Sequence, residues 1–177
     1  ASAVTLQPIA RYGFDAAIIF SDILIVPWAM NRNVRFKTGV GPLLDAMEKP
    51  DDIDASCLDG LSKKLAPVGK SLTLTRAALP PETTLIGFAG APWTLITYMA
   101  EGSTSRDFPK ARQWAWQNVK ALDGLLDILI EATISFLSLQ AQSGAQTLML
   151  FDSWASAVPA AQRDWLVTKP GRAIVEG

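Results

Sequence analysis

Short apolar runs that follow glycine or proline recur along the chain, and they predict buried strands. Three of them stand out, at residues 15–20 (DAAIIF), 84–88 (TLIGF) and 147–151 (TLMLF). Each combines β-branched and large apolar side chains in a run too short for a helix, which is typical of strands covered on both faces. We therefore expect three parallel strands within one sheet.

A long amphipathic pattern lies between the second and third of these runs. From residue 122 to residue 140 the apolar side chains recur every three or four positions, which predicts a helix with one buried face. Gly144 is a natural end for it. Strands that alternate with helices favour a parallel sheet.

Two shorter helices are also expected. One should span residues 108–119, with Trp114 near its middle and Thr104-x-x-Asp107 as a capping box before it. The other should span residues 57–65, capped by Ser56. Residues 31–54, which are rich in glycine, proline and acidic side chains, predict an irregular excursion with a short amphipathic segment.

Polar or small residues follow each predicted strand directly: Ser21-Asp22, Ala89-Gly90-Ala91-Pro92 and Asp152-Ser153. In a (β/α)8 barrel, the residues at the carboxyl ends of the strands line the active site, so these motifs should converge. A complete barrel takes about 250 residues, whereas this chain has 177. We expect an α/β fold of the TIM-barrel type, an incomplete barrel that forms one domain over residues 1–177.

Composition removes several classes of protein. The chain is 49% hydrophobic with a net charge of −1, which excludes a wholly disordered protein and argues against a dedicated nucleic-acid binder. It has no His and one Cys, Cys57, so these residues cannot build a His-based triad or a Cys/His zinc site. We see no signal peptide or membrane span and expect a cytoplasmic protein. The missing initiator Met suggests processing or a start inside a longer chain.

Four motifs occur in an order that resembles one family. They are Phe20-Ser21-Asp22-Ile23-Leu24; Gly87-Phe88-Ala89-Gly90-Ala91-Pro92-Trp93-Thr94; Thr97-Tyr98-Met99 with Glu101-Gly102; and Phe151-Asp152-Ser153-Trp154-Ala155. Together they closely resemble bacterial uroporphyrinogen decarboxylases, over essentially the whole chain.

The resemblance implies a single-domain (β/α)8 barrel that works without a cofactor, usually as a homodimer. Such enzymes remove CO₂ from the four acetate side chains of uroporphyrinogen to give coproporphyrinogen. The chain looks like the middle half of such an enzyme. An arginine-rich amino-terminal segment and a carboxyl-terminal part with an active-site His are not in it, so we expect the 177 residues alone to be inactive or nearly so.

By resemblance, three residues form the site. Asp22 would accept hydrogen bonds from the pyrrole N–H groups, Tyr98 would contact the substrate or Asp22, and Ser153 would touch a substrate carboxylate. Each has a simpler interpretation. Asp22 can be a helix cap, Tyr98 a core tyrosine that hydrogen-bonds a neighbour, and Ser153 the cap of the next helix.

Several other residues are weaker candidates for the site. Asp152 is interpreted as structural, and the glycines of 87–94 as allowing close backbone approach. The arginines Arg35, Arg106 and Arg112 could meet substrate carboxylates, although solvated surface charge is the favoured interpretation. Three residues depart from the family pattern and could narrow the pocket or restrict its loops: Trp28, Ser103 and Ser156.

Two alternatives to the decarboxylase remain open. Corrinoid-dependent methyltransferases share this barrel superfamily, but they bind zinc through His and Cys. The other alternative is a non-catalytic truncated barrel, whose exposed strand edges would favour association.

Overall fold

A three-stranded parallel sheet forms the centre of the molecule. The computed structural model describes residues 1–39 and 41–177. The strands β1 (Ala16–Ile18), β4 (Thr84–Gly90) and β5 (Thr147–Phe151) pair in the order β1-β4-β5, and both pairings are parallel. This confirms the predicted parallel sheet, although β1 is shorter than the apolar run that predicted it.

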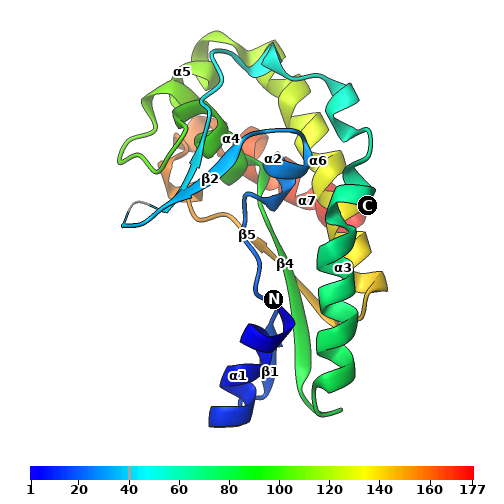
Figure 1. Ribbon diagram of the computed structural model, residues 1–177. Coiled ribbons are helices and arrows are strands. Elements are labelled where there is room, and N and C mark those ends of the chain that lie inside the picture. The colour runs from blue at the N-terminus through cyan, green and yellow to red at the C-terminus, as the bar shows by residue number, and fades with distance from the viewer. Residues whose placement is uncertain (40) are drawn as a thin grey trace.

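Helices cover one face of the sheet, where α3 (Leu61–Ala78) and α6 (Val119–Gln142) pack on β4 and against each other (Figure 1). The predicted long helix is thus confirmed as α6, and Gly144 follows its end with a φ of 108°. The remaining helices are α1 (Ser2–Tyr12), α2 (Ile25–Ala29), α4 (Pro92–Glu101), α5 (Pro109–Gln117) and α7 (Lys169–Glu176). No helix among the described residues is both long and apolar enough to cross a membrane.

The helix predicted over residues 57–65 is wrong in its bounds. A 3-10 turn, Ala55–Leu58, comes first, and α3 begins only after Gly60, whose φ of 75° interrupts the helical path. Ser56 is not the cap. Its backbone N–H donates to the Asp54 carboxylate at 2.9 Å, so Asp54 caps the turn.

The capping box predicted before residue 108 is wrong as well. Helix α5 begins at Pro109, and the backbone N–H groups of Lys110 and Ala111 donate to Oε1 of Glu101, at 2.8 and 3.1 Å. A carboxylate at the end of α4 therefore caps α5. The excursion over 31–54 contains an antiparallel hairpin of β2 (Val34–Lys37) and β3 (Gly41–Leu44), followed by a 3-10 turn at Pro50–Asp52.

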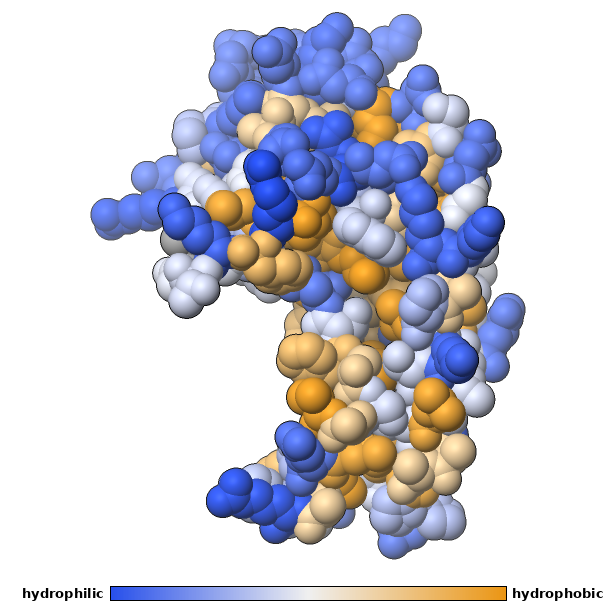
Figure 2. Space-filling view, viewed as in Figure 1, coloured by the Kyte–Doolittle hydropathy of each residue, from blue (hydrophilic) through white to orange (hydrophobic). Residues whose placement is uncertain are grey.

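The sheet has two edge strands, and each is unpaired along its outer side. Because the order is β1-β4-β5, β1 and β5 are both edges, and Ile18, Phe20, Leu148 and Met149 expose apolar side chains there. Apolar residues also gather on the hollowed side of the molecule, near α1 and β1 (Figure 2). A closed barrel has no such edges, so the described residues form an incomplete (β/α)8 barrel.

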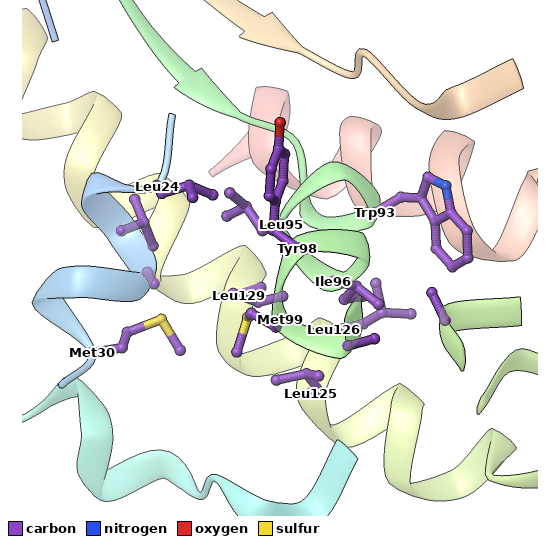
Figure 3. Packing of buried hydrophobic residues seen from close by; sticks show 14 of the residues in the cluster. Leu24, Met30, Trp93, Leu95, Ile96, Tyr98, Met99, Leu125, Leu126 and Leu129 are labelled. Atoms are coloured by element: carbon purple, nitrogen blue, oxygen red, sulfur yellow. The ribbon is translucent and has the colours of Figure 1, made fainter. Parts of the chain in front are cut away.

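Helix α4 lies inside the molecule rather than on its surface. Every residue from Pro92 to Ala100 is buried, and its side chains meet those of α2 and α6 in the main apolar cluster (Figure 3). The helix begins with proline at its first position and ends at Gly102 in the left-handed conformation. Because α4 is buried, the side chains that it presents near the carboxyl edge of the sheet are held in fixed positions.

Candidate active site

The turn after β1 places Asp22 at the carboxyl edge of the sheet. Its Oδ1 accepts the backbone N–H of Leu24 at 2.7 Å, and its backbone carbonyl accepts the N–H of Ile25 at 3.2 Å. The carboxylate thus orders the turn that leads into α2, but it does not cap the helix, whose N-cap residue is Leu24 without a side-chain cap. It is half-buried and shares a cavity of about 220 Å³ with Trp28, Val34 and Phe36, among others. Its second oxygen, Oδ2, has no hydrogen bond from the described residues and can accept one from a ligand.

Helix α4 brings Tyr98 toward this carboxylate. Tyr98 is only 7% exposed, and its oxygen points away from Met99 and Leu129 (Figure 3). Burial raises the pKa of Tyr98 above its usual value, the neighbouring Trp154 side chain opposes this rise, and the negative charge of Asp22 adds to it. The phenol therefore stays protonated at neutral pH and can donate a hydrogen bond.

The residues after β5 are tied to the start of α4. The Thr94 hydroxyl donates to Oδ1 of Asp152 at 2.7 Å and accepts the backbone N–H of Trp154 at 3.3 Å. The backbone N–H of Ala91 also donates to the Phe151 carbonyl, at 2.7 Å. Burial raises the pKa of Asp152, and the Thr94 hydrogen bonds partly oppose the rise. These contacts agree with the structural role expected for Asp152.

Ser153 lies at the same edge of the sheet but lines a different cavity. This second cavity, of about 590 Å³, runs along α1 and β1 and also touches Ser21, Phe88 and Phe151. None of its lining residues is charged, so it offers no acid or base. Ser153 is exposed, and the 3-10 turn that follows it has no side-chain cap. The charge of Asp22 thus acts on the Tyr98 hydroxyl, while Ser153 faces a separate cavity from that of Asp22.

The weaker candidates lie mostly at the surface. Arg35 pairs with Asp45 in the hairpin, with both side chains more than half exposed, and Arg106 and Arg112 are exposed. Ser103 and Ser156 do not have a positive φ, so a side chain at either position causes no backbone strain. The change that does reach the site is Trp28, which forms part of the cavity wall beside Asp22.

Thr94 and Trp154 were missed as parts of the site, although both belong to motifs quoted from the sequence. Thr94 joins the α4 start to the β5 end, and the Trp154 backbone accepts the indole N–H of Trp93 and donates to Thr94. A signal was present, because Thr94 and Trp154 each lie within four residues of the end of a strand, and the two strands end at one edge. The sequence did not show that Thr94 and Trp154 contact each other.

The fold and this edge-of-sheet carboxylate define a barrel protein of the TIM type, with its polar residues at the carboxyl ends of parallel strands. The family model for uroporphyrinogen decarboxylase (URO-D) matches residues 1–177. The chain therefore belongs to the uroporphyrinogen decarboxylase family, as the motifs indicated.

Curated relatives named uroporphyrinogen decarboxylase agree with this. The protein of Granulibacter bethesdensis is 48% identical over 98% of this chain and 51% of its own length. That of Maricaulis maris is 46% identical over 99% of this chain and 51% of its length, and that of Caulobacter vibrioides 46% over 100% and 50%. The chain spans about half the length of the curated relatives it matches.

A solved structure is similar in fold. A methyltransferase from Methanosarcina mazei superposes with a TM-score of 0.78 at 14% identity, over 99% of this chain and 52% of that one. At this identity the likeness concerns the fold alone. It supports the assignment of an incomplete barrel.

Proposed function

We propose that this chain contributes the Asp22 site of an enzyme that decarboxylates the four acetate side chains of uroporphyrinogen to give coproporphyrinogen. The observation that carries the proposal is a carboxylate with a free oxygen at the carboxyl edge of the sheet, beside a buried tyrosine, in a chain of this family. The relatives' names supply the reaction.

The chemistry requires an anion at this place. A pyrrole acetate loses CO₂ only when its ring can accept the electron pair of the breaking C–C bond, and protonation of a ring carbon makes the ring such an acceptor. The exocyclic carbon left behind then takes up a proton to become a methyl group, and the ring returns its added proton. The ring is cationic once it is protonated, becomes neutral when it takes the electron pair of the broken C–C bond, and is cationic again from protonation of the exocyclic carbon until the ring proton leaves. The Asp22 carboxylate stabilises the cationic forms while accepting the N–H hydrogen bonds of the ring.

Neighbouring residues complete the proposed site. Tyr98 donates a hydrogen bond beside Asp22, and Ser153 contacts a carboxylate of the bound tetrapyrrole at the rim. We further propose that the enzyme needs no cofactor, acts in the cytoplasm as a homodimer, and binds neither nucleic acid nor membrane. Supporting this are the near-neutral charge of the chain and the family it belongs to.

A hybrid enzyme tests the proposal. The matching segment of the Maricaulis maris protein is replaced by these 177 residues, and coproporphyrinogen formation is assayed for the hybrid and for the 177-residue chain alone. The hybrid should turn over uroporphyrinogen, and the chain alone should not. A hybrid that folds but does not turn over uroporphyrinogen contradicts the proposal.

The role of Asp22 is tested in the hybrid by Asp22→Asn, which keeps the shape but removes the charge. Loss of one preorganised electrostatic contact typically costs on the order of 10²-fold in kcat. The matched control is Asp127→Asn, an exposed carboxylate on α6, which should leave turnover unchanged. Equal turnover in the two variants removes Asp22 from the mechanism.

A further inference from the structure

A polar cavity of opposite charge adjoins that of Asp22. It has a volume of about 320 Å³, and Trp28 and Val34 line both cavities, so the two share a wall. Its other lining residues are Asn31, Arg32, Asn33 and Lys64. Two cations therefore face one space, and no carboxylate of the described residues lines it.

Lys64 is fixed in this cavity by the end of α2. Its ammonium donates to the backbone carbonyl of Ala29 at 3.0 Å and to Oδ1 of Asn31. Asn31 follows the helix with a φ of 67°, a left-handed conformation that asparagine tolerates better than most residues. These contacts explain Lys64 as a cap of the short helix, but an ammonium has three donors and only two are used. The third N–H is available to a ligand.

Arg32 is held by the turn after β3. Its Nη2 donates to the backbone carbonyl of Asp45 at 2.9 Å, while its Nε is buried and has no hydrogen-bond partner among the described residues. A guanidinium carries five N–H donors, so the protein satisfies this one only in part. A buried donor without an acceptor costs free energy, which a bound acceptor would restore.

The carboxylates around Arg32 have other partners. That of Asp45 pairs with Arg35. Those of Asp52 and Asp54, which line a separate cavity with Arg32, accept backbone N–H groups at 2.8 to 3.0 Å. None of these carboxylates lines the 320 Å³ cavity. The two cations there therefore have no counter-ion from the part of the chain that the structure describes.

We propose that Arg32 and Lys64 form a subsite for a carboxylate, next to the Asp22 carboxylate that accepts N–H groups. A ligand that spans both cavities carries N–H donors at one end and an acid at the other, as a pyrrole with a carboxylated side chain does. Guanidinium and ammonium groups make strong, charge-assisted hydrogen bonds to such an acid. That the acid belongs to uroporphyrinogen rests on the proposed function, whereas the binding of a carboxylate does not.

The subsite should hold an acid that the reaction leaves in place. Contacts with two cations stabilise a carboxylate, whereas loss of CO₂ moves its charge into the ring. The same contacts would therefore raise the barrier if they held the reacting acetate. We assign the subsite to a propionate, the other acidic side chain of each pyrrole, which coproporphyrinogen keeps. Its binding positions the ring against Asp22.

The first test needs no turnover. Sodium propionate is titrated into the 177-residue chain, and the indole N–H resonance of Trp28, assigned by its loss in Trp28→Phe, reports on the cavity that Trp28 lines. Propionamide, which has the same shape without the charge, is the matched control ligand, and sodium chloride keeps the ionic strength constant. The resonance should shift to saturation with propionate and much less with propionamide. Equal shifts with the two ligands overturn the proposal.

Arg32→Gln and Lys64→Gln each remove one cation. Each should weaken propionate binding by about tenfold, the effect expected when one charge-assisted hydrogen bond is lost. The matched control is Lys63→Gln, at an exposed position beside Lys64 on α3, which should leave the affinity unchanged. Circular dichroism shows whether each variant is folded. An unchanged affinity in either folded variant overturns the proposal.

In the hybrid enzyme, Arg32→Gln and Lys64→Gln should each raise the KM for uroporphyrinogen by about tenfold and lower kcat by a smaller factor. Lys63→Gln should change neither. A KM equal to that of the unmodified hybrid in both variants overturns the assignment to a substrate side chain. If the hybrid forms no coproporphyrinogen while propionate binds as expected, the proposed function is wrong and the carboxylate subsite stands.

Discussion

The side-chain amide of Gln140 binds both backbone groups of Phe88. Its Oε1 accepts the Phe88 N–H at 2.9 Å, and its Nε2 donates to the Phe88 carbonyl at 2.8 Å. Gln140 is fully buried on α6 and Phe88 lies in β4, so one side chain joins the long helix to the central strand. It supplies to Phe88 the two bonds that another strand would otherwise make.

Replacing this amide should be costly. Gln140→Leu leaves a buried N–H and a buried carbonyl without partners, and each such group costs about 1–3 kcal/mol. We expect the free energy of unfolding in denaturant to fall by about 2–4 kcal/mol. Gln142→Leu, at an exposed position on the same helix, should change it by less than about 0.5 kcal/mol. Equal effects of the two changes would contradict the role of Gln140.

Gly87 makes room for this contact. A Cβ at Gly87 would lie 2.6 Å from Oε1 of Gln140 and 3.1 Å from the Ala145 side chain. Gly87→Ala should therefore destabilise the chain, and by less when Gln140 is already replaced by Ala, because the two residues are coupled.

The control for this cycle is Gly124→Ala on α6, where a Cβ meets nothing within 4 Å. That change should stabilise the helix by about 0.5–1 kcal/mol. Strictly additive effects of Gly87→Ala and Gln140→Ala would show that the close approach has no energetic consequence.

Asp152 should make stability depend on pH. Burial raises its folded-state pKa above the ordinary value of 3.8, so the folded chain holds the proton more tightly than the unfolded chain. Its contribution to stability is fully present below the unfolded pKa and is lost as the pH rises through the folded pKa. Asp152→Asn is neutral throughout and can still accept the Thr94 hydrogen bond.

The thermal midpoint of Asp152→Asn minus that of the unmodified chain should therefore increase from about pH 4 to about pH 7. Melting curves at a series of pH values measure it, with Asp127→Asn as the exposed control. A difference in thermal midpoint that stays constant over this range would mean that the folded and unfolded chains bind the proton of Asp152 with equal affinity.

Trp28 should limit the size of the cavity beside Asp22. It is 43% exposed, so Trp28→Ala should change stability little, while the cavity it shares with Asp22 becomes wider. In the hybrid enzyme we expect a lower KM for uroporphyrinogen and a smaller change in kcat. Trp116→Ala, at an exposed tryptophan on α5, is the control. A KM that is unchanged by Trp28→Ala would show that the wall does not restrict the substrate.

Local pattern was sufficient for the sheet and its long helix. Runs of apolar residues after turn signals located β4 and β5, and the three-to-four-residue spacing located α6, because burial on two faces or on one face leaves a direct mark on the sequence. Helix α4 left no such mark, since it is apolar on every side. Helix α3 was foreseen only at its start, because its sequence includes Pro67 and Gly69, which normally argue against a helix interior.

The motifs at the strand ends placed Asp22, Tyr98 and Ser153 at one edge of the sheet from the sequence alone, because parallel strands end together. Which of them meet was decided by tertiary structure. Tyr98 lies within the influence of the Asp22 charge because α4 is packed inside the molecule, and Ser153 turns to a separate cavity. Likewise, the contacts of Gln140 with Phe88 and of Thr94 with Asp152 join residues far apart in the chain. Hydrogen bonds of this kind depend on distances and angles that only the packed helices fix, and no periodicity in the sequence encodes them.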